Sequence, residues 1–349
     1  MIFRSRKKHE SAETGPEAQG GSVATADVEA LEAEIAELTR LNRESPDAER
    51  EQRLVELRHM AGIGRLERAS AGASFPEPSF DRLPDRNGGL AGVAPEDVTP
   101  ELVRAGILRD GCLLIRGLVD PAEAQQLARE IDKSFDARDA EQAGGEGDPA
   151  FYSEFLPDPR FRESLGRDWV AGGGGLWAAD SPRVLFRMLD TFERGRLLDV
   201  IGGYLGEPPV VSVQKCTLRR VDPDAGAGWH QDGAFMGDVR ALNVWLSLSH
   251  CGDNAPGMDV IPRRLDGIVP TGTEGAIFDW SVSPQVIEET AGETGVLRPI
   301  FEPGDVLLFD ELFLHSTAAD PSMPNSRWAI ESWFFGASAA PSDYSPLSA

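Results

Sequence analysis

The sequence predicts an α+β fold in which helical segments come first and a β-rich half follows. Between residues 210 and 335, several short segments that are β-branched or alternate apolar with polar residues are separated by Gly and Pro turns. Helical patterns do not alternate regularly with these segments, which disfavours a parallel sheet. Many short strands without alternating helices are typical of a double-sheet barrel or jelly roll.

The composition excludes two classes of partner. The 349-residue chain carries 34 Lys and Arg against 58 Asp and Glu, which gives a net charge of −24. A chain this acidic offers no basic face to phosphates, so we expect it to bind neither nucleic acid nor an anionic membrane surface. It also contains no run of about 18 apolar residues, the length that a membrane-spanning helix needs.

The cysteines indicate the cellular compartment. The chain has three, Cys112, Cys216 and Cys251, and none belongs to a C-x-x-C pair. An odd number without such a pair disfavours a disulfide scaffold or a cysteine zinc site. The basic residues at the start are not followed by an apolar segment, so they do not form a secretory signal. A reducing, cytoplasmic location fits these features.

Composition divides the chain into four predicted segments. Residues 1–26 are rich in Gly, Ala, Ser and Glu, and we expect them to form a flexible tail. Residues 27–70 are expected to form a helical arm, and the Pro- and Gly-rich residues 71–94 a linker. The main domain is expected over residues 95–340.

The helical arm carries a short heptad pattern that Pro46 ends, followed by a second helical stretch. The apolar positions of the first helix are Val28, Leu31, Ile35 and Leu38. So short a pattern fits two interpretations. One is a short coiled coil through which the chain forms a homodimer, and the other is an amphipathic hairpin that packs on the main domain.

The main domain is predicted to alternate short elements with Gly- and Pro-rich turns. A helix opens at Asp120-Pro121, and the charged, Gly-rich residues 138–150 are expected to form a loop. The other predicted helices cover 99–105 and 182–205. Strands are predicted over 111–117, 210–221, 241–249, 258–262, 296–301, 305–309 and 328–335.

Two of the five histidines lie where a metal site can be assembled. His230 and Asp232 are separated by one residue, so on a strand both side chains point to the same side. His315, which follows a Gly-Asp turn and the apolar strand 305–309, is the candidate for a third ligand. Two His and one carboxylate on one face of a metal are typical of non-haem Fe(II) oxygenases. The open positions can take a bidentate co-substrate and dioxygen.

Arg327 is the candidate partner for such a co-substrate. A 2-oxo acid that chelates iron keeps its far carboxylate free, and a planar guanidinium can bind that group with two hydrogen bonds. Arg327 lies twelve residues after His315, across a Pro-containing turn and at the start of the strand 328–335. A hairpin would therefore place Arg327 beside the strand that carries His315.

With these residues, the sequence resembles the phytanoyl-CoA dioxygenase family of Fe(II)- and 2-oxoglutarate-dependent oxygenases. His230-Gln231-Asp232, His315 and Arg327 match the pattern of that family. The surrounding segments 111–118, 229–233, 242–248 and 303–309 match its strands as well. The resemblance covers residues 95 to 336 and does not include the helical arm.

The resemblance implies a double-stranded β-helix, a jelly-roll or cupin-like core, with flanking helices. It implies that His230, Asp232 and His315 bind Fe(II), and that Arg327 pairs with the far carboxylate of 2-oxoglutarate. Further co-substrate contacts are implied for Thr317, Trp245, Gln231 and Thr217. The implied reaction uses dioxygen to hydroxylate an unactivated C–H bond of a small molecule and releases succinate and CO2. Related halogenating enzymes have a small residue in place of Asp232, so the carboxylate favours hydroxylation.

Two departures from the family and two alternatives remain at this point. Residues 262–265 replace a Pro-Gly-Ser-His segment found in many members, and the long connection 270–295 is expected to carry substrate specificity. One alternative function is a metal-binding cupin-like barrel with non-oxygenase chemistry. The other is a catalytically silent scaffold protein that assembles through the helical arm.

Overall fold

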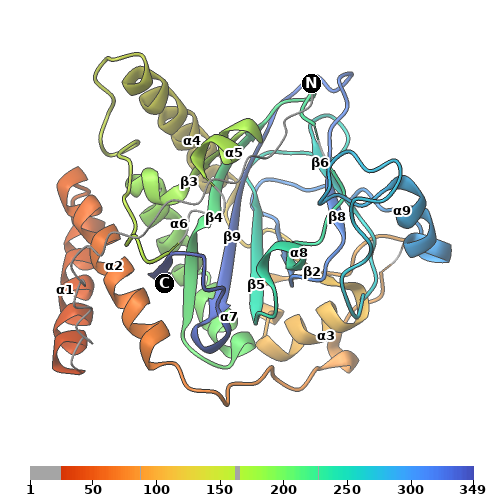
Figure 1. Ribbon diagram of the computed structural model, residues 1–349, viewed down its shortest axis with the longest axis horizontal. Helices are drawn as coiled ribbons and strands as arrows, with labels where there is room; N and C mark the ends of the chain where they lie inside the picture. The colour runs from red at the N-terminus through yellow and green to blue at the C-terminus, as the bar shows by residue number, and fades with distance from the viewer. Residues whose placement is uncertain (1–24, 87, 162–165, 227) are drawn as a thin grey trace, which may run out of the picture.

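The computed structural model describes residues 25–86, 88–161, 166–226 and 228–349, and it confirms the α+β class. A large sheet stands at the centre, with most of the helices on one side and a small sheet on the other (Figure 1). Nearly all of the tail predicted for residues 1–26 lies outside the described residues, and the first helix begins at Thr25. Within the described part of the chain, no helix has the length and apolar character needed to cross a membrane.

The helices and strands follow in chain order. The helices are α1 (Thr25–Glu44), α2 (Ala48–Arg68), α3 (Pro100–Asp110), α4 (Pro121–Gln142), α5 (Arg167–Gly172), α6 (Pro182–Arg194), α7 (Leu197–Leu205), α8 (Gly233–Met236) and α9 (Pro284–Ala291). The strands are β1 (Gly92–Val93), β2 (Cys112–Ile115), β3 (Gly175–Trp177), β4 (Pro209–Val221), β5 (Ala241–Ser247), β6 (Gly257–Val260), β7 (Val306–Phe309), β8 (His315–Ala318), β9 (Arg327–Gly336) and β10 (Pro346–Ser348).

The strands form two sheets. The large sheet has the order β1-β2-β7-β5-β9-β4-β10, and β3 pairs with residues 217–219 of β4, beyond the part of β4 that β10 covers. Its pairs are antiparallel except β1 with β2. The small sheet contains β6 and β8, which pair antiparallel with Val260 opposite His315.

The alternation along β5 separates two buried layers. Leu242, Val244 and Leu246 pack in one apolar cluster with the buried faces of α4, α6 and α7. Trp245 points to the opposite face and belongs to a second cluster that also contains Phe309 of β7. Because successive side chains of a strand point to opposite faces, one strand serves both the helical layer and the space between the sheets.

Glycine and a left-handed residue divide the helix that was predicted over 182–205. Helix α6 ends at Arg194 and α7 begins at Leu197. Between them, Arg196 has a φ of 56°, so the helical hydrogen-bond ladder cannot continue through it. The other predicted helix boundaries shift as well, and α4 extends to Gln142 into the predicted loop 138–150.

The strand predicted over 296–301 is not formed. Leu297 and Phe301 make only single bridges, to Val260 and Cys251. Pro299 lies between them and has no N–H group, so this segment cannot complete a ladder.

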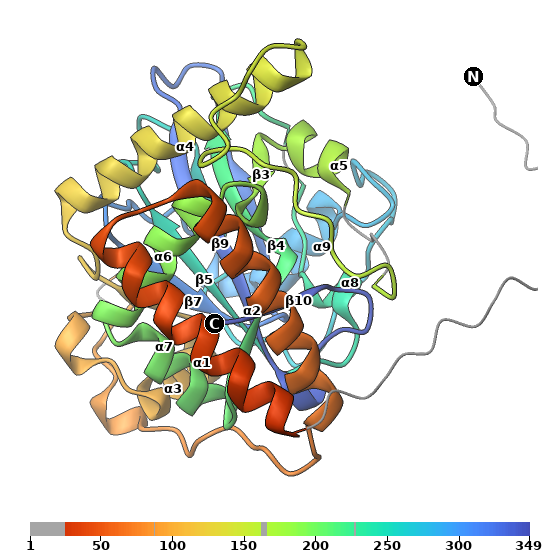
Figure 2. The ribbon, with the colours of Figure 1, turned by 90° about the vertical axis from the view of Figure 1, so that its left-hand side faces the viewer.

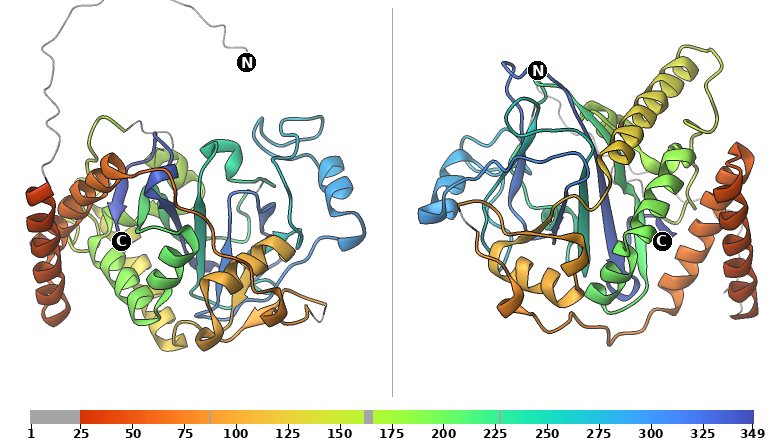
Figure 3. Two further views of the ribbon diagram at one scale, coloured as in Figure 1. Left: turned by 90° about the horizontal axis from the view of Figure 1, so that it is seen from below. Right: turned by 180° about the vertical axis from the view of Figure 1, so that it is seen from behind.

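The helical arm packs on the main domain of its own chain (Figure 2). Leu31 and Ile35 of α1, with the partly buried Leu38, belong to the same apolar cluster as Leu54 and Leu57 of α2. The side chain of Val28 lies outside those described. The apolar seam of the predicted coiled coil is therefore occupied within the chain. After α2, the chain passes beneath the large sheet to reach α3 (Figure 3).

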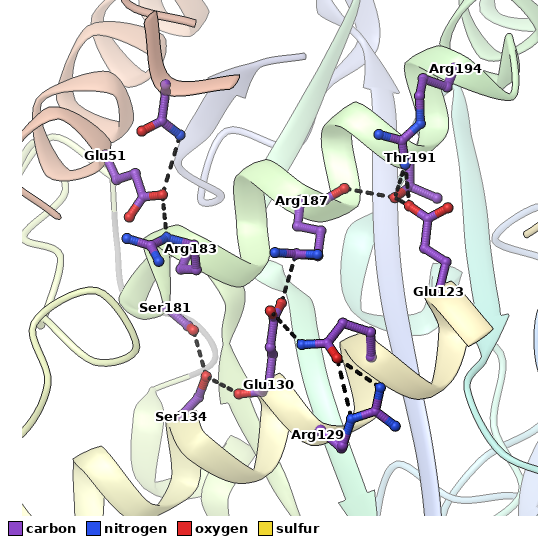
Figure 4. A network of polar contacts seen from close by, with 12 residues as sticks. Glu51, Glu123, Arg129, Glu130, Ser134, Ser181, Arg183, Arg187, Thr191 and Arg194 are labelled. Atoms are coloured by element: carbon purple, nitrogen blue, oxygen red, sulfur yellow. Dashed lines mark hydrogen bonds and ion pairs between the residues drawn. The ribbon is translucent and has the colours of Figure 1, made fainter. Parts of the chain in front are cut away.

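A polar network joins α2, α4 and α6, and we call it the helix network (Figure 4). Arg183 of α6 pairs with the buried Glu51 of α2 at 2.5 Å. Arg187 of α6 pairs with the buried Glu130 of α4 at 2.8 Å. Glu123 of α4 pairs with Arg194 of α6. Each of these acids therefore has its own arginine.

Candidate metal centre

His230, Asp232 and His315 converge on one point between the two sheets. His230 precedes α8, and His315 begins β8. Their backbones bridge, since His230 N–H donates to His315 O at 2.9 Å and His315 N–H donates to His230 O at 3.1 Å. One potential ligand atom from each of the three residues lies within 4.8 Å of the others.

Hydrogen bonds orient both imidazole rings. The Nδ1 of His230 lies 2.8 Å from Gly228 O, and that of His315 lies 3.0 Å from Phe313 O. A carbonyl oxygen can only accept, so each ring donates from Nδ1, and in its neutral form it keeps the lone pair on Nε2. Both rings thus present the nitrogen that a metal ion binds.

Asp232 offers one free oxygen to the same point. Its Oδ1 accepts a hydrogen bond of 2.6 Å from the Lys215 ammonium. Its Oδ2 is buried without a hydrogen-bond partner and lies 3.8 Å from Nε2 of His315. A buried carboxylate oxygen without a partner costs free energy, so a cation is the group that this position is suited to receive.

The surroundings set the protonation states that metal binding requires. Burial and the neighbouring His230 lower the pKa of His315 to about 4, so its ring is neutral at pH 7. Burial raises the pKa of Asp232, but Lys215 and the two imidazoles outweigh it and hold this pKa far below the ordinary value. His315 therefore offers a neutral nitrogen beside the carboxylate of Asp232.

A cavity of about 430 Å³ opens above the triad. Its walls come from both sheets, with Thr217 on β4, Trp245 on β5 and Arg327 on β9 facing Met258 on β6 and Thr317 on β8. This volume lies in the range of small-molecule sites. The three candidate ligands also line it, so a bound molecule would contact a metal there directly.

Arg327 is buried in this cavity with its charge unpaired. Its Nη1 donates to Gly257 O at 2.9 Å, and its guanidinium lies 5.4 Å from the centre of the Trp245 ring. Its Nε has no partner, and no carboxylate of the described residues forms an ion pair with it. Burial lowers the pKa of Arg327 to about 10, so it remains a cation at pH 7.

The structure places Arg327 differently from the predicted hairpin. Strand β8 pairs with β6, whereas β9 pairs with β4 and β5, so β8 and β9 are not neighbours. Arg327 instead reaches across the space between the sheets to the backbone of β6 at Gly257.

Three of the four further predicted contact residues line the cavity, and Gln231 does not. Thr317, Trp245 and Thr217 are lining residues, and Oγ1 of Thr217 is buried without a partner. The Gln231 side chain instead donates to the backbone oxygens of residues 267 and 312 and accepts from the backbone N–H of residue 269. Gln231 therefore points away from the metal point and holds these loops.

Four charged residues that line the cavity were not among the predicted site residues: Asp168 at its mouth, and Lys215, Arg219 and Glu331 inside it. Lys215 and Arg219 share a face of β4 with Thr217, at the two-residue spacing of a strand. Glu331 faces them from β9, with Arg219 at 3.3 Å and Lys215 at 4.0 Å. The alternation around Thr217 was the signal that could have identified Lys215, one of only a few lysines in the chain.

A comparison with known protein families found a matching family. The family described as phytanoyl-CoA dioxygenase (PhyH) matches residues 107–324, which is more than half of the chain. No curated protein matches the chain at a significant level.

Several solved structures are similar to the chain at low identity. They include EctD from S. alaskensis with 2-oxoglutarate and 5-hydroxyectoine, which is 18% identical with a TM-score of 0.46 over 77% of this chain and 85% of that one. AviO1 from Streptomyces viridochromogenes Tue57 is 18% identical, with a TM-score of 0.42 over 68% of this chain and 96% of that one. The epimerase SnoN in complex with Fe3+, alpha ketoglutarate and nogalamycin RO is 17% identical, with a TM-score of 0.43 over 69% of this chain and 86% of that one.

Proposed function

We propose that this chain, which belongs to the phytanoyl-CoA dioxygenase family of 2-oxoglutarate-dependent oxygenases, hydroxylates a C–H bond of a small molecule. The observation that carries the proposal is that the buried, unpaired Arg327 shares one cavity with two histidines and an aspartate. A metal hydrolase would need the three ligands but not a buried cation opposite them. A 2-oxo acid needs both.

The donor set fits Fe(II). Nε2 of His230, Nε2 of His315 and Oδ2 of Asp232 would hold the ion, and the partnerless Oδ2 is the observation that supports this assignment. When bound, Fe(II) would supply the oxidation chemistry by which dioxygen, 2-oxoglutarate and a C–H bond become succinate, CO2 and an alcohol.

The residues around the triad orient it. Lys215 would hold Oδ1 of Asp232, so that this carboxylate presents only Oδ2. The backbone oxygens of Gly228 and Phe313 would keep the two rings in the tautomer that leaves Nε2 free.

The co-substrate would lie between the triad and Arg327. Its far carboxylate would accept hydrogen bonds from the guanidinium, which then gains the anionic partner that it lacks within the protein. Thr217 would donate its partnerless hydroxyl, and Thr317 and Trp245 would line the sides. Gln231 is left out of this set because its amide is fully engaged with backbone groups.

We also infer the domain plan. A core lined from both sheets is what a double-stranded β-helix would present, and we assign it to residues 95–340, with 27–70 as an arm packed on it. A cytoplasmic location is supported by three buried cysteines that form no disulfide. Homodimerisation through α1 and α2 stays a prediction, and a dimer would have to use their outer charged faces.

The test is an anaerobic titration of the metal-free protein with Fe(II) and then with 2-oxoglutarate. We expect the weak visible charge-transfer band of the iron–oxo acid chelate. His315→Ala should abolish the band, and Arg327→Ala should shift its appearance to higher 2-oxoglutarate concentration. A wild-type protein that binds metal without forming the band would overturn the oxygenase proposal in favour of other metal chemistry. A protein that binds no metal would point to a scaffold role.

A further inference from the structure

The mouth of the cavity is built from aromatic side chains to which the proposed oxidation assigns no role. They are Trp169, Phe235, Phe278 and Trp280, and we call them the aromatic wall. Trp169, Phe235 and Phe278 are exposed to 57%, 42% and 44%, which is unusual for large apolar rings. They come from α5, from α8 and from the connection between β6 and α9, so folding alone brings them together.

The aromatic wall runs from solvent to the metal centre. Trp280 is its middle member, with ring centres 4.8 Å from Phe278, 6.0 Å from Trp169 and 5.8 Å from Phe235. The ring of Trp280 also lies 5.7 Å from that of His230. A carbon atom placed for oxidation at the metal would therefore be close to Trp280 as well.

Backbone contacts fix the loop that carries two of these rings. Phe278 N–H donates to Ser281 Oγ at 2.9 Å, and Ser281 N–H returns a bond of 3.0 Å to Phe278 O. Val282 N–H donates to Trp229 O at 2.8 Å, next to His230 in the chain. A Cβ at Gly228 would approach Ser281 to 3.1 Å, so glycine allows the close approach of the loop. The wall is thus preorganised before any ligand binds.

The charges that line the cavity compensate one another, so the cavity does not favour a charged substrate. Lys215 is paired with Asp232, and Arg219 with Glu331. Arg327 is the cation assigned to the far carboxylate of 2-oxoglutarate. Fe(II) and the 2-oxoglutarate dianion would add two charges of each sign. Among the lining residues, the three cations Lys215, Arg219 and Arg327 are then balanced by the three acids Asp168, Asp232 and Glu331, so a substrate ion would enter this desolvated space uncompensated.

One of these three acids stands at the mouth and attracts a cation only weakly. Asp168 precedes Trp169 in α5, lines the cavity and is exposed. An exposed carboxylate is screened by water, so its attraction for a cation is weak beside the contact area of four aromatic rings.

Building on the proposed function, we propose that the substrate is an uncharged compound whose oxidised carbon belongs to or adjoins a ring system that packs on the aromatic wall. Rings make the offset and edge contacts that aromatic side chains favour. They also lose few internal rotations on binding, unlike an acyclic chain of the same size. The wall, through Trp280 and Phe278, then determines substrate specificity.

Equilibrium dialysis of the full-length, metal-free protein tests the inference without iron, oxo acid or turnover. The probes are naphthalene methanol, its cationic counterpart naphthalene methylamine, and the acyclic alcohol nonanol. We expect naphthalene methanol to bind at least about tenfold more tightly than the other two. Trp280→Ala and Phe278→Ala should each weaken its binding about tenfold. The matched control is Phe80→Ala, because Phe80 is 52% exposed but does not line the cavity.

Each other result would overturn the inference. Equal or tighter binding of the amine would make the wall a cation site, and equal binding of nonanol would make it a site for acyclic chains. Unchanged binding in both wall variants would place the probe elsewhere. Phe278→Leu, which keeps apolar bulk, replaces Phe278→Ala if circular dichroism shows that the alanine variant is unfolded. Failure of the charge-transfer band with intact naphthalene methanol binding would instead overturn only the proposed reaction.

Discussion

Two polar clusters of this chain differ in how their charges are compensated. In the helix network, Glu51 and Glu130 are buried, and each is paired with one arginine of α6 (Figure 4). In the cavity, Arg327 is equally buried but has no carboxylate partner, and Oδ2 of Asp232 accepts no hydrogen bond. The helix network also contains buried oxygens without a hydrogen bond, Oε2 of Glu51 and Oε2 of Glu130, so the difference lies in the charges. Each acid of the helix network has an arginine and holds helices together, whereas the Arg327 guanidinium has no carboxylate and is complementary to an anion that is not part of the chain.

The largest expected difference between the clusters is in metal binding. His315→Ala should lower Fe(II) affinity by more than about a hundredfold, because removing a ligand costs more than removing an outer partner. Turnover of 2-oxoglutarate should be lost with it. Glu130→Gln in the helix network should change neither. Calorimetric metal titration and succinate assays measure both quantities, and retained iron affinity in His315→Ala would remove His315 from the site.

A matched pair of arginine substitutions should separate function from stability. Arg327→Met should raise the KM for 2-oxoglutarate about a hundredfold. It should leave the free energy of unfolding equal or higher, since an unpaired buried charge is removed. Arg183→Met should lower the free energy of unfolding by about 3 kcal/mol, while the KM stays unchanged, because it leaves the buried Glu51 carboxylate without a cation and with only the amide of Asn42 as a donor. Urea unfolding and steady-state kinetics give both values. Destabilisation by Arg327→Met would show that its charge is compensated within the fold.

Acid should destabilise the metal-free cavity through His315. Burial and His230 lower the pKa of His315 to about 4 in the folded state, against about 6.5 in the unfolded chain. The unfolded state therefore binds more protons between these values, and stability falls as pH drops through that window. We expect wild type to lose about 2–3 kcal/mol more than His315→Gln between pH 7 and pH 4.5 in urea unfolding. Parallel losses in the two proteins would contradict the assignment.

The smallest expected difference concerns two threonines. Thr217→Val should raise the KM for 2-oxoglutarate about fivefold without loss of stability, because its buried hydroxyl has no partner in the free protein. Thr191 of the helix network donates to Glu123 and to Arg187 O. Thr191→Val should therefore cost about 1 kcal/mol of stability and leave the KM unchanged. A loss of stability without a change of KM in Thr217→Val, or a raised KM in Thr191→Val, would contradict these assignments.

Features that depend on neighbouring residues could be predicted from the sequence. The two-residue spacing of His230 and Asp232 predicted that they face one side, and both line the cavity, although they do not lie on a strand: His230 makes a single bridge and Asp232 has helical dihedral angles at the start of α8. Strand alternation did place Trp245 opposite Leu242 and Val244. The same rule could have turned Gln231 away from the metal point, but the family resemblance overrode it. Turns could be predicted where Gly and Pro restrict the backbone. The strand predicted over 296–301 was wrong because Pro299 has no N–H group to donate to a neighbouring strand.

Contacts between segments that are distant in the sequence could not be predicted from such local patterns. The pairing of Lys215 with Asp232, the crossing of Arg327 to Gly257 and the meeting of Trp169 with Trp280 each join separate strands, helices or loops. A local pattern states which face a side chain takes, because backbone geometry repeats every two or 3.6 residues. It does not state which other face lies opposite, because sheet order and packing settle that across the whole chain. The three candidate ligands and Arg327 could therefore be predicted from the sequence, whereas the charge balance and the aromatic wall around them follow only from the assembled fold.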